Sequence, residues 1–525
     1  MKINNDITKS PAFAGGAMSP LTSALYTLSN NDMLNASFVD LFAMDTPRTI
    51  VEFKNRGKEA GIEMGFREYT GTFIAEFSAA VFALGVSKLF SKFYKPDVKV
   101  NSGSWATNSS LEVFDSIYKT SDSTPEGFVK NALNSMTGLV GNKTKAFSDI
   151  DEEKAKPVID GLVNLITDKN ISKKDYKKAS EGIQTQIVNL LGADNNVTLK
   201  SQGKEFSSNL THAIRDLTDL GKNVFFKEGA ENSDKIISKL KTMNKSRIAI
   251  AIPLSMGLAI TNQYINRRLT KKRTGIDNFV GENGYEQNVK DKKQSEGQKG
   301  LLAKKMLSAG VFLAMLTKVM GVQKPSDFVS KLEFTGPATG GNAIKTIYGT
   351  LILGRIFASK DSTELRETNV RDYLGFLNWL VLGGFVSKGV AQALDPKREA
   401  LFNVAKEGKG VVHWLKDISL KSQKEIIAQG GDIKSNLRKL NAAQLAGIGY
   451  SALMLGFFLP KLNIWMTKRG GKNKEQQNNT VQNPSFDSVN PFRQNTAKAE
   501  KGTLPFQALK FDEFLNKAKM NSRNA

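Results

Sequence analysis

The sequence predicts an all-α, multi-pass helical membrane protein with a polar helical domain and a disordered basic C-terminal tail. Two uncharged runs, residues 248–265 and 442–460, contain 18 and 19 residues, and about 20 apolar residues span the hydrocarbon core of a bilayer. Residues 246–467 hold both runs and carry +15 of the formal net charge of +23. Basic residues beside apolar runs are typical of spans whose ends lie among lipid phosphates.

The N-terminal part divides into two predicted segments. Residues 1–46 are rich in Asn, Ser and Thr, and we expect an irregular segment there. Residues 47–95 predict a charged helix that begins at Pro47 and then an apolar run whose core is 73–86. Because this core is short, it could cross the membrane, lie in the interface or be buried in protein. The N-terminus lacks an apolar core behind a basic start, so we do not expect a cleavable signal peptide.

Residues 96–245 predict a polar helical domain with an almost neutral charge balance of 21 basic and 20 acidic residues. Apolar residues recur there at helical spacing, which indicates helices that bury one face against a common core. Three such stripes are Phe128, Val129, Ala132, Leu133 and Met136; Val158, Ile159, Leu162, Val163 and Ile166; and Phe206, Leu210, Ile214 and Leu217.

Residues 246–467 predict a helical membrane region with about three to five spans. Besides the two long runs, the weaker runs 306–317, 344–358 and 373–387 each contain or adjoin a charged residue. Each could cross the membrane, lie in the interface or be buried in protein. Two pairs of small residues four apart within 442–460, Gly447 with Ser451 and Ala452 with Gly456, would allow close helix contact.

Charged residues inside or beside the apolar runs are the only site candidates, because ionisable groups in a membrane are costly and are often functional. They are Glu76, Lys318, Lys345, Arg355 and Lys388. Glu76 could form a buried pair with a base such as Lys318. The alternative interpretation is that these groups lie near the ends of short runs and reach the lipid head groups.

Most catalytic and cofactor chemistry finds no support in the sequence. The absence of cysteine excludes thiolate metal sites and cysteine nucleophiles. His212 and His413 are the only histidines, which leaves too few for a histidine metal centre. Residues 336–346 contain glycines and a lysine, but the lysine does not follow the second glycine as a phosphate-binding loop requires. We therefore expect no catalytic, cofactor-binding or metal residues and no cofactor, and the sequence favours a protein without enzymatic activity.

The tail, residues 468–525, is rich in Asn, Gln and Lys and predicts a flexible basic segment. Within it, residues 506–520 predict a short amphipathic helix that could dock on lipid or on a protein partner.

The sequence thus favours an integral membrane protein, in a bacterial inner membrane, that anchors a helical domain as a structural or interaction protein. Its expected partners are the lipid bilayer and anionic head groups, with a protein partner possible at the tail. Two alternatives remain open: a subunit of a transporter or channel, and a soluble helical protein that binds an anionic partner. Nucleic acid is the less expected anionic partner, because the basic charge accompanies apolar runs. The oligomeric state is not determined by the sequence.

Overall fold

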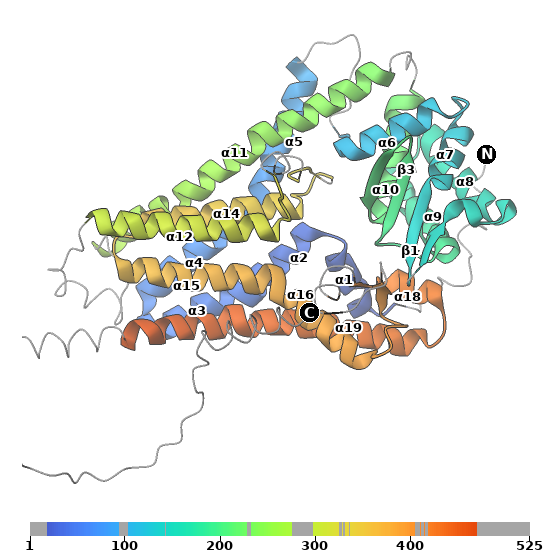
Figure 1. Ribbon diagram of the computed structural model, residues 1–525. Helices are drawn as coiled ribbons and strands as arrows, with labels where there is room; N and C mark the ends of the chain where they lie inside the picture. Colours follow the sequence, from blue (N-terminus) through green and yellow to red (C-terminus); the bar gives the residue numbers. More distant parts are fainter. Residues whose placement is uncertain are drawn as a thin grey trace, which may run out of the picture. The chain divides into compact units, whose positions relative to one another are not determined.

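The computed structural model describes residues 18–93, 103–141, 143–227, 233–275, 298–324, 328, 331–334, 336–404, 410, 414 and 418–469. Within these residues the chain is mostly helical, with a few short strands (Figure 1). The predicted tail, including its helix at 506–520, lies outside the described residues apart from residues 468 and 469.

The described part of the N-terminal segment is helical, so the prediction of an irregular segment over 1–46 is wrong from residue 18 onward. The elements are α1 (Pro20–Ser29), α2 (Asp32–Phe38), the π-helical segment η3 (Val39–Asp45) and α3 (Thr46–Arg56). Two of the polar residues that suggested irregularity are helix caps. The side chain of Ser19 accepts a hydrogen bond from the backbone N–H of Thr22, and that of Asn31 accepts one from Leu34.

These helices form the first arm of a helical hairpin. The elements α2, η3 and α3 are continuous, and the chain reverses direction at Gly57. Gly57 has a φ of +89°, which favours glycine over residues with a side chain. The return helix consists of α4 (Lys58–Phe73), η4 (Ile74–Ser78) and α5 (Ala79–Phe93), and α4 packs along α3.

The predicted polar helical domain is an α/β domain, which corrects the expectation that it contains helices alone. Its four strands form an antiparallel sheet in the order β2-β1-β3-β4, with Thr137 opposite Ala146 and Leu199 opposite Phe206. The strands are β1 (Met136–Val140), β2 (Lys143–Ala146), β3 (Val197–Ser201) and β4 (Lys204–Ser208). The helices are α6 (Asn108–Lys119), α7 (Pro125–Asn134), η5 (Phe147–Asp149), α8 (Glu152–Thr167), α9 (Lys173–Leu191), α10 (Leu210–Leu220) and η6 (Gly221–Phe225).

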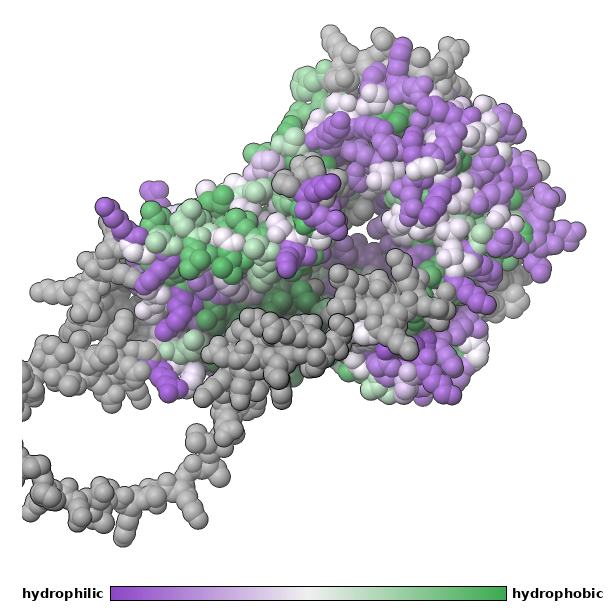
Figure 2. All heavy atoms as spheres, viewed as in Figure 1, coloured by the Kyte–Doolittle hydropathy of each residue, from purple (hydrophilic) through white to green (hydrophobic). Residues whose placement is uncertain are grey.

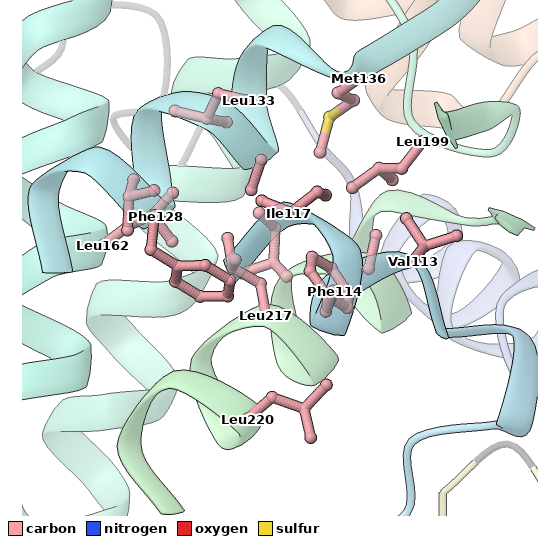
Figure 3. Close-up of a cluster of buried hydrophobic side chains, with 14 of the residues drawn as sticks. Val113, Phe114, Ile117, Phe128, Leu133, Met136, Leu162, Leu199, Leu217 and Leu220 are labelled. Carbon is pink, nitrogen blue, oxygen red and sulfur yellow. The ribbon is translucent and has the colours of Figure 1, made fainter. Parts of the chain in front are cut away.

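This domain has its own hydrophobic core (Figure 3). Phe114 and Phe128 are fully buried in it, with ring centres 6.3 Å apart. Leu162 of α8 and Leu199 of β3 are also fully buried there, so helices and sheet share one core. The predicted helical stripes therefore identify core residues correctly even where part of a stripe belongs to a strand.

The predicted boundary at residue 245 falls inside one helix, α11 (Ser233–Thr274). Its first turns bury Leu240 and Met243 in the core of the α/β domain. Its later turns bury Ile252 and Ala259 in a second core among the long helices. A single helix of 42 residues thus belongs to both cores.

Further helices build the second core, and α12, α14 and α15 pack side by side (Figure 1). The elements after α11 are α12 (Gln298–Val319), α14 (Gly341–Ala358), α15 (Ser362–Leu377), η7 (Asn378–Leu382), α16 (Gly383–Leu394), β5 (Phe402–Val404), β6 (Ile418–Leu420), α18 (Gln423–Gln429), α19 (Ile433–Ser451) and η8 (Ala452–Phe458). The strands β5 and β6 pair antiparallel, and a third core surrounds them.

Four helices of the described residues are long and apolar enough to cross a membrane: Lys58–Phe93, Ser233–Thr274, Lys299–Val319 and Ile433–Arg469. They include the two long runs and the runs 73–86 and 306–317. The runs 344–358 and 373–387 are not among the four. Most of α14 is buried inside the protein, which is one of the alternatives that the sequence left open.

Large apolar side chains are exposed on the long helices and not on the described α/β domain, residues 103–227. Phe42, Phe93 and Leu307 are each about two-thirds exposed or more, at 67%, 67% and 71%. Figure 2 shows hydrophobic residues gathered on α11 and α12, whereas the surface of the α/β domain is mostly hydrophilic.

Candidate functional site

The helix from α2 to α3 buries several charged side chains beside its apolar core residues, and it exposes several large apolar side chains. The inward side chains are at most 8% exposed, and they are Asp40, Asp45, Arg48, Glu52 and Arg56. The outward side chains are at least 38% exposed, and they are Phe38, Phe42, Ile50 and Phe53. A helix of a water-soluble protein normally shows the reverse pattern.

The inward charges join others in a buried network that centres on Glu68. The Oε2 atom of Glu68 lies 3.7 Å from Nη1 of Arg48 and 3.3 Å from Nη2 of Arg355. Nη1 of Arg355 donates a hydrogen bond of 3.1 Å to Oδ1 of Asp372, which also accepts one of 2.8 Å from Nε of Arg371. Burial raises the pKa of the Asp372 carboxyl, but Arg371 and Arg355 outweigh burial and hold that pKa below its usual range.

A second group of ion pairs extends the network along α3 and α15. Nη1 of Arg56 lies 3.4 Å from Oε2 of Glu52, one helical turn earlier, and Nη2 of Arg56 donates to Oε1 of Glu367. Arg267 of α11 pairs with Glu364 of α15. These pairs connect α3, α11 and α15 through charged groups that lie inside the protein.

Three buried carboxyl groups lie beyond the arginines. Thr72 donates a hydrogen bond of 2.8 Å to Oδ2 of Asp45, and Ser37 donates one to Oε2 of Glu76. Both carboxyl oxygens of Asp40 and Oε1 of Glu76 are buried without a hydrogen-bond partner among the described residues. Asp40 and Glu76 lie on the π-helical segments η3 and η4, and π-helical turns are frequent at functional sites.

Two small cavities adjoin the network, and both are lined by Arg48 and Arg371. The first, of about 10 Å³, also meets Tyr348 and Asp372. The second, of about 30 Å³, is also lined by Glu367. Cavities of this size with polar walls have room for a water molecule or two.

The network gathers many charged groups, but the two small cavities beside it offer little room to a larger ligand. Among the described residues, no group of three or more His, Asp or Glu side chains is arranged to hold a metal ion. His212 lies half-buried in the α/β domain, and His413 lies outside the described residues. Ionisable groups among apolar helices are costly unless paired, and they commonly mark a functional site.

The structure brings two of the five predicted residues, Glu76 and Arg355, into this network. Glu76 accepts a hydrogen bond from Ser37 and does not pair with Lys318, which is exposed near the end of α12. Lys345 is half-buried and donates a hydrogen bond of 3.3 Å to Asn342. Lys388 is half-buried on α16.

The sequence interpretation missed most of the network because it examined charges only within the apolar runs. The signal was present in the spacing of Asp45, Arg48, Glu52 and Arg56, which fall on one face of a helix. The aromatic residues Phe42 and Phe53 lie beside this face and are exposed. Comparisons of the chain with models of protein families, with curated proteins and with solved structures find no match.

Proposed function

We propose that this chain is an integral membrane protein that anchors its α/β domain at the surface of a bilayer as a structural or interaction protein. The observation that carries the proposal is the helix from Asp32 to Arg56, which buries charged side chains and exposes large apolar ones. Its buried charges and exposed aromatic side chains suit a surrounding solvent of lipid rather than water. The expected partner is the lipid bilayer, including anionic head groups near the basic ends of the long helices.

The distribution of exposed side chains supports the same proposal. Large apolar side chains cover helices such as α5, α11 and α12, whereas the described α/β domain has a hydrophilic surface. Water disfavours large contiguous apolar patches on a protein surface. A bilayer around the long helices would match their exposed apolar side chains, and water around the α/β domain would match its hydrophilic surface.

A subunit of a transporter or channel is the second candidate, and the network around Glu68 is the observation that favours it. Charged groups inside membrane proteins commonly mark ion and proton pathways, and a buried ion pair is weak evidence for a role in stability. An anchor alone would not require so many buried ionisable residues on several helices.

Extraction tests membrane integration directly. Membranes from cells that express the full chain would be washed with alkaline carbonate, which strips peripheral proteins and leaves spanning ones. We expect the chain to stay in the pellet until detergent is added. Release into the wash would overturn the proposal, because the long helices would then pack against protein instead of lipid.

Single cysteines test which faces contact lipid, and the chain suits this experiment because it contains no cysteine. In opened membranes, a water-soluble maleimide should label Lys177→Cys on α9 rapidly. It should label Phe42→Cys and Leu307→Cys much more slowly, because a thiol in lipid does not ionise. All three positions are exposed in the protein itself: the Lys177 side chain is 78% exposed, Phe42 is 67% exposed and Leu307 is 71% exposed. Equal labelling in membranes would contradict burial in lipid.

A further inference from the structure

The ends of several long helices meet at one end of the protein. Arg273, near the end of α11, pairs with Glu59 at the start of α4. Lys304 of α12 donates a hydrogen bond of 3.0 Å to Oγ of Ser362 at the start of α15. A further hydrogen bond joins α15 to the last turns of the helix Ile433–Arg469. Figure 1 shows α3, α12 and α15 reaching this same end.

This end of the protein is strongly basic. We define the basic end as residues 54–63, 267–275, 298–305, 357–366 and 461–469. These segments together hold 16 basic and 4 acidic residues. Of their described side chains, 12 basic ones and one acidic one are exposed. The surface of the basic end therefore carries a large excess of positive charge and attracts anionic partners.

Exposed aromatic and apolar side chains lie beside these bases. Tyr264 of α11, Leu302 of α12 and Trp465 of the last helix are each about half exposed, at 49%, 55% and 54%. The guanidinium carbon of Arg469 lies 5.4 Å from the centre of the Trp465 ring. Trp and Tyr are enriched where a bilayer meets water, at the level of the head groups. A basic surface with an apolar border suits phospholipid better than a polyanion dissolved in water.

The α/β domain lies at the other end of α11. Leu240, near the start of this helix, is buried in the core of the α/β domain, whereas Arg273 belongs to the basic end. The helix between these two residues is about 50 Å long, and the hydrocarbon core of a bilayer is about 30 Å thick. Tyr26 of α1 donates a hydrogen bond of 2.9 Å to Asp194 of the α/β domain, so the start of the hairpin lies at that end as well.

We propose that the basic end binds the head groups of anionic phospholipids, on the side of the membrane opposite to the α/β domain. Charge attraction to a lipid surface acts within about 8 Å at physiological ionic strength, so exposed bases beside an apolar border lie within its range. The inference rests on the proposed membrane integration. It adds the lipid class, the residues that bind it and the side of the bilayer on which they lie.

Binding of phosphatidylglycerol to the purified full chain in detergent tests the surface, with native mass spectrometry as the readout. We expect wild type to bind phosphatidylglycerol more tightly than phosphatidylcholine, and added salt should reduce the difference. A triple variant with Arg268→Gln, Lys272→Gln and Lys468→Gln removes three exposed bases from the basic end. Its affinity for phosphatidylglycerol should fall about tenfold or more.

The matched control is a triple variant with Lys173→Gln, Lys174→Gln and Lys178→Gln. It removes the same charge from exposed positions on α9 of the α/β domain, and it should bind phosphatidylglycerol as wild type does. An equal loss in both variants, or equal binding of the two lipids by wild type, would overturn the surface. Tighter binding of a short DNA duplex or of polyglutamate than of phosphatidylglycerol would overturn phospholipid as its occupant.

Single cysteines test the two sides of the membrane. In sealed vesicles of one orientation, a membrane-impermeant maleimide should label either Lys272→Cys at the basic end or Lys177→Cys on α9, and it should label both after the vesicles are opened. Labelling of both positions in sealed vesicles would overturn the placement on opposite sides. A chain that an alkaline carbonate wash releases fails as an integral membrane protein. A chain that stays in the pellet but shows no preference for phosphatidylglycerol contradicts the present inference alone.

Discussion

The guanidinium carbon of Arg247 lies 3.8 Å from the centre of the Trp105 ring. Arg247 is 1% exposed, and its Nε atom donates a hydrogen bond of 2.7 Å to Oγ of Ser87 on α5. Its Nη2 atom donates one of 2.8 Å to the backbone oxygen of Ser104. One side chain of α11 therefore forms hydrogen bonds both to α5 and to the segment that leads into the α/β domain.

A double-mutant cycle should detect this contact. We expect Arg247→Met and Trp105→Leu each to lower the free energy of unfolding, with a coupling energy of about 1–2 kcal/mol for a desolvated cation–π pair. Unfolding in denaturing detergent, followed by circular dichroism, gives the values. Trp465→Leu is the control, because Trp465 is 54% exposed and should not couple to Arg247. A coupling energy of zero for Trp105 would mean that the ring contributes packing alone.

Glu68 should be the most sensitive carboxylate of the buried network. Glu68→Gln removes the negative charge that faces both Arg48 and Arg355. The positive charges of these two buried guanidinium groups are then less fully neutralised. We expect a loss of roughly 3–5 kcal/mol in the free energy of unfolding, the usual cost of breaking a buried ion pair. Thermal unfolding of the purified chain in detergent measures the loss.

An exposed ion pair gives the control for Glu68. Glu181 lies 3.9 Å from Lys177 on α9, and both side chains are more than half exposed. Glu181→Gln should change stability by less than about 1 kcal/mol. Similar small effects for both variants would show that water reaches Glu68 and that the network is not desolvated.

The contribution of His212 to the stability of the α/β domain should be lost in mild acid. Burial, assisted by Arg215, lowers the pKa of His212 to about 4, whereas an unfolded histidine titrates near 6.5. Between these values the unfolded chain binds the extra proton. The contribution of His212 to stability is therefore complete above about pH 6.5 and is lost as the pH falls toward 4, by roughly 2–3 kcal/mol.

His212→Gln isolates this effect, because glutamine does not titrate. Its stability should depend less on pH between 6.5 and 4 than that of the wild type, as measured by urea unfolding at several pH values. The comparison with wild type is necessary because burial raises the pKa of Asp216 and of Asp219, and these groups act in the opposite direction. Identical pH dependence in both proteins would contradict the burial of an uncharged His212.

The sequence predicted core residues better than it predicted element types. Phe206 fits a helical stripe with Leu210 and Ile214, because a spacing of four also occurs by chance between a strand and the next helix. The structure places Phe206 on β4 and begins α10 at Leu210, yet all three residues are buried in the core as expected. A strand of five residues is too short for its alternation to outweigh a neighbouring helical pattern.

The buried network was harder to predict because its residues are distant in the sequence. Arg56 and Glu367 are separated by 311 positions, and no local pattern indicates that they meet. Glu76 and Arg355 were identified because a charge inside an apolar run is visible without a partner. Asp40 was overlooked because its segment was interpreted as irregular, so its place on a helix was not considered.

The small residues of α19 were predicted to allow close helix contact, and the structure confirms this. A Cβ atom on Gly447 would lie 2.0 Å from Oγ of Ser387 and 2.8 Å from the backbone oxygen of Gly383 on α16. One on Gly456 would lie 2.6 Å from the backbone oxygen of Ala43. The absence of side chains at these two positions lets α19 and η8 approach their neighbours.

Gly447→Ala should therefore force α16 and α19 apart, and we expect a loss of about 1–3 kcal/mol in the free energy of unfolding, as for overpacked cores. Gly449→Ala is the matched control in the same helix, because its Cβ would meet nothing within 4 Å. That variant should be neutral or stabilising by up to about 1 kcal/mol, since alanine favours helix more than glycine does. Thermal unfolding of the two variants side by side separates packing from helix propensity. Equal stabilisation by both substitutions would show that the two helices can separate without cost, and the small-residue contact would then have no role in holding α16 against α19.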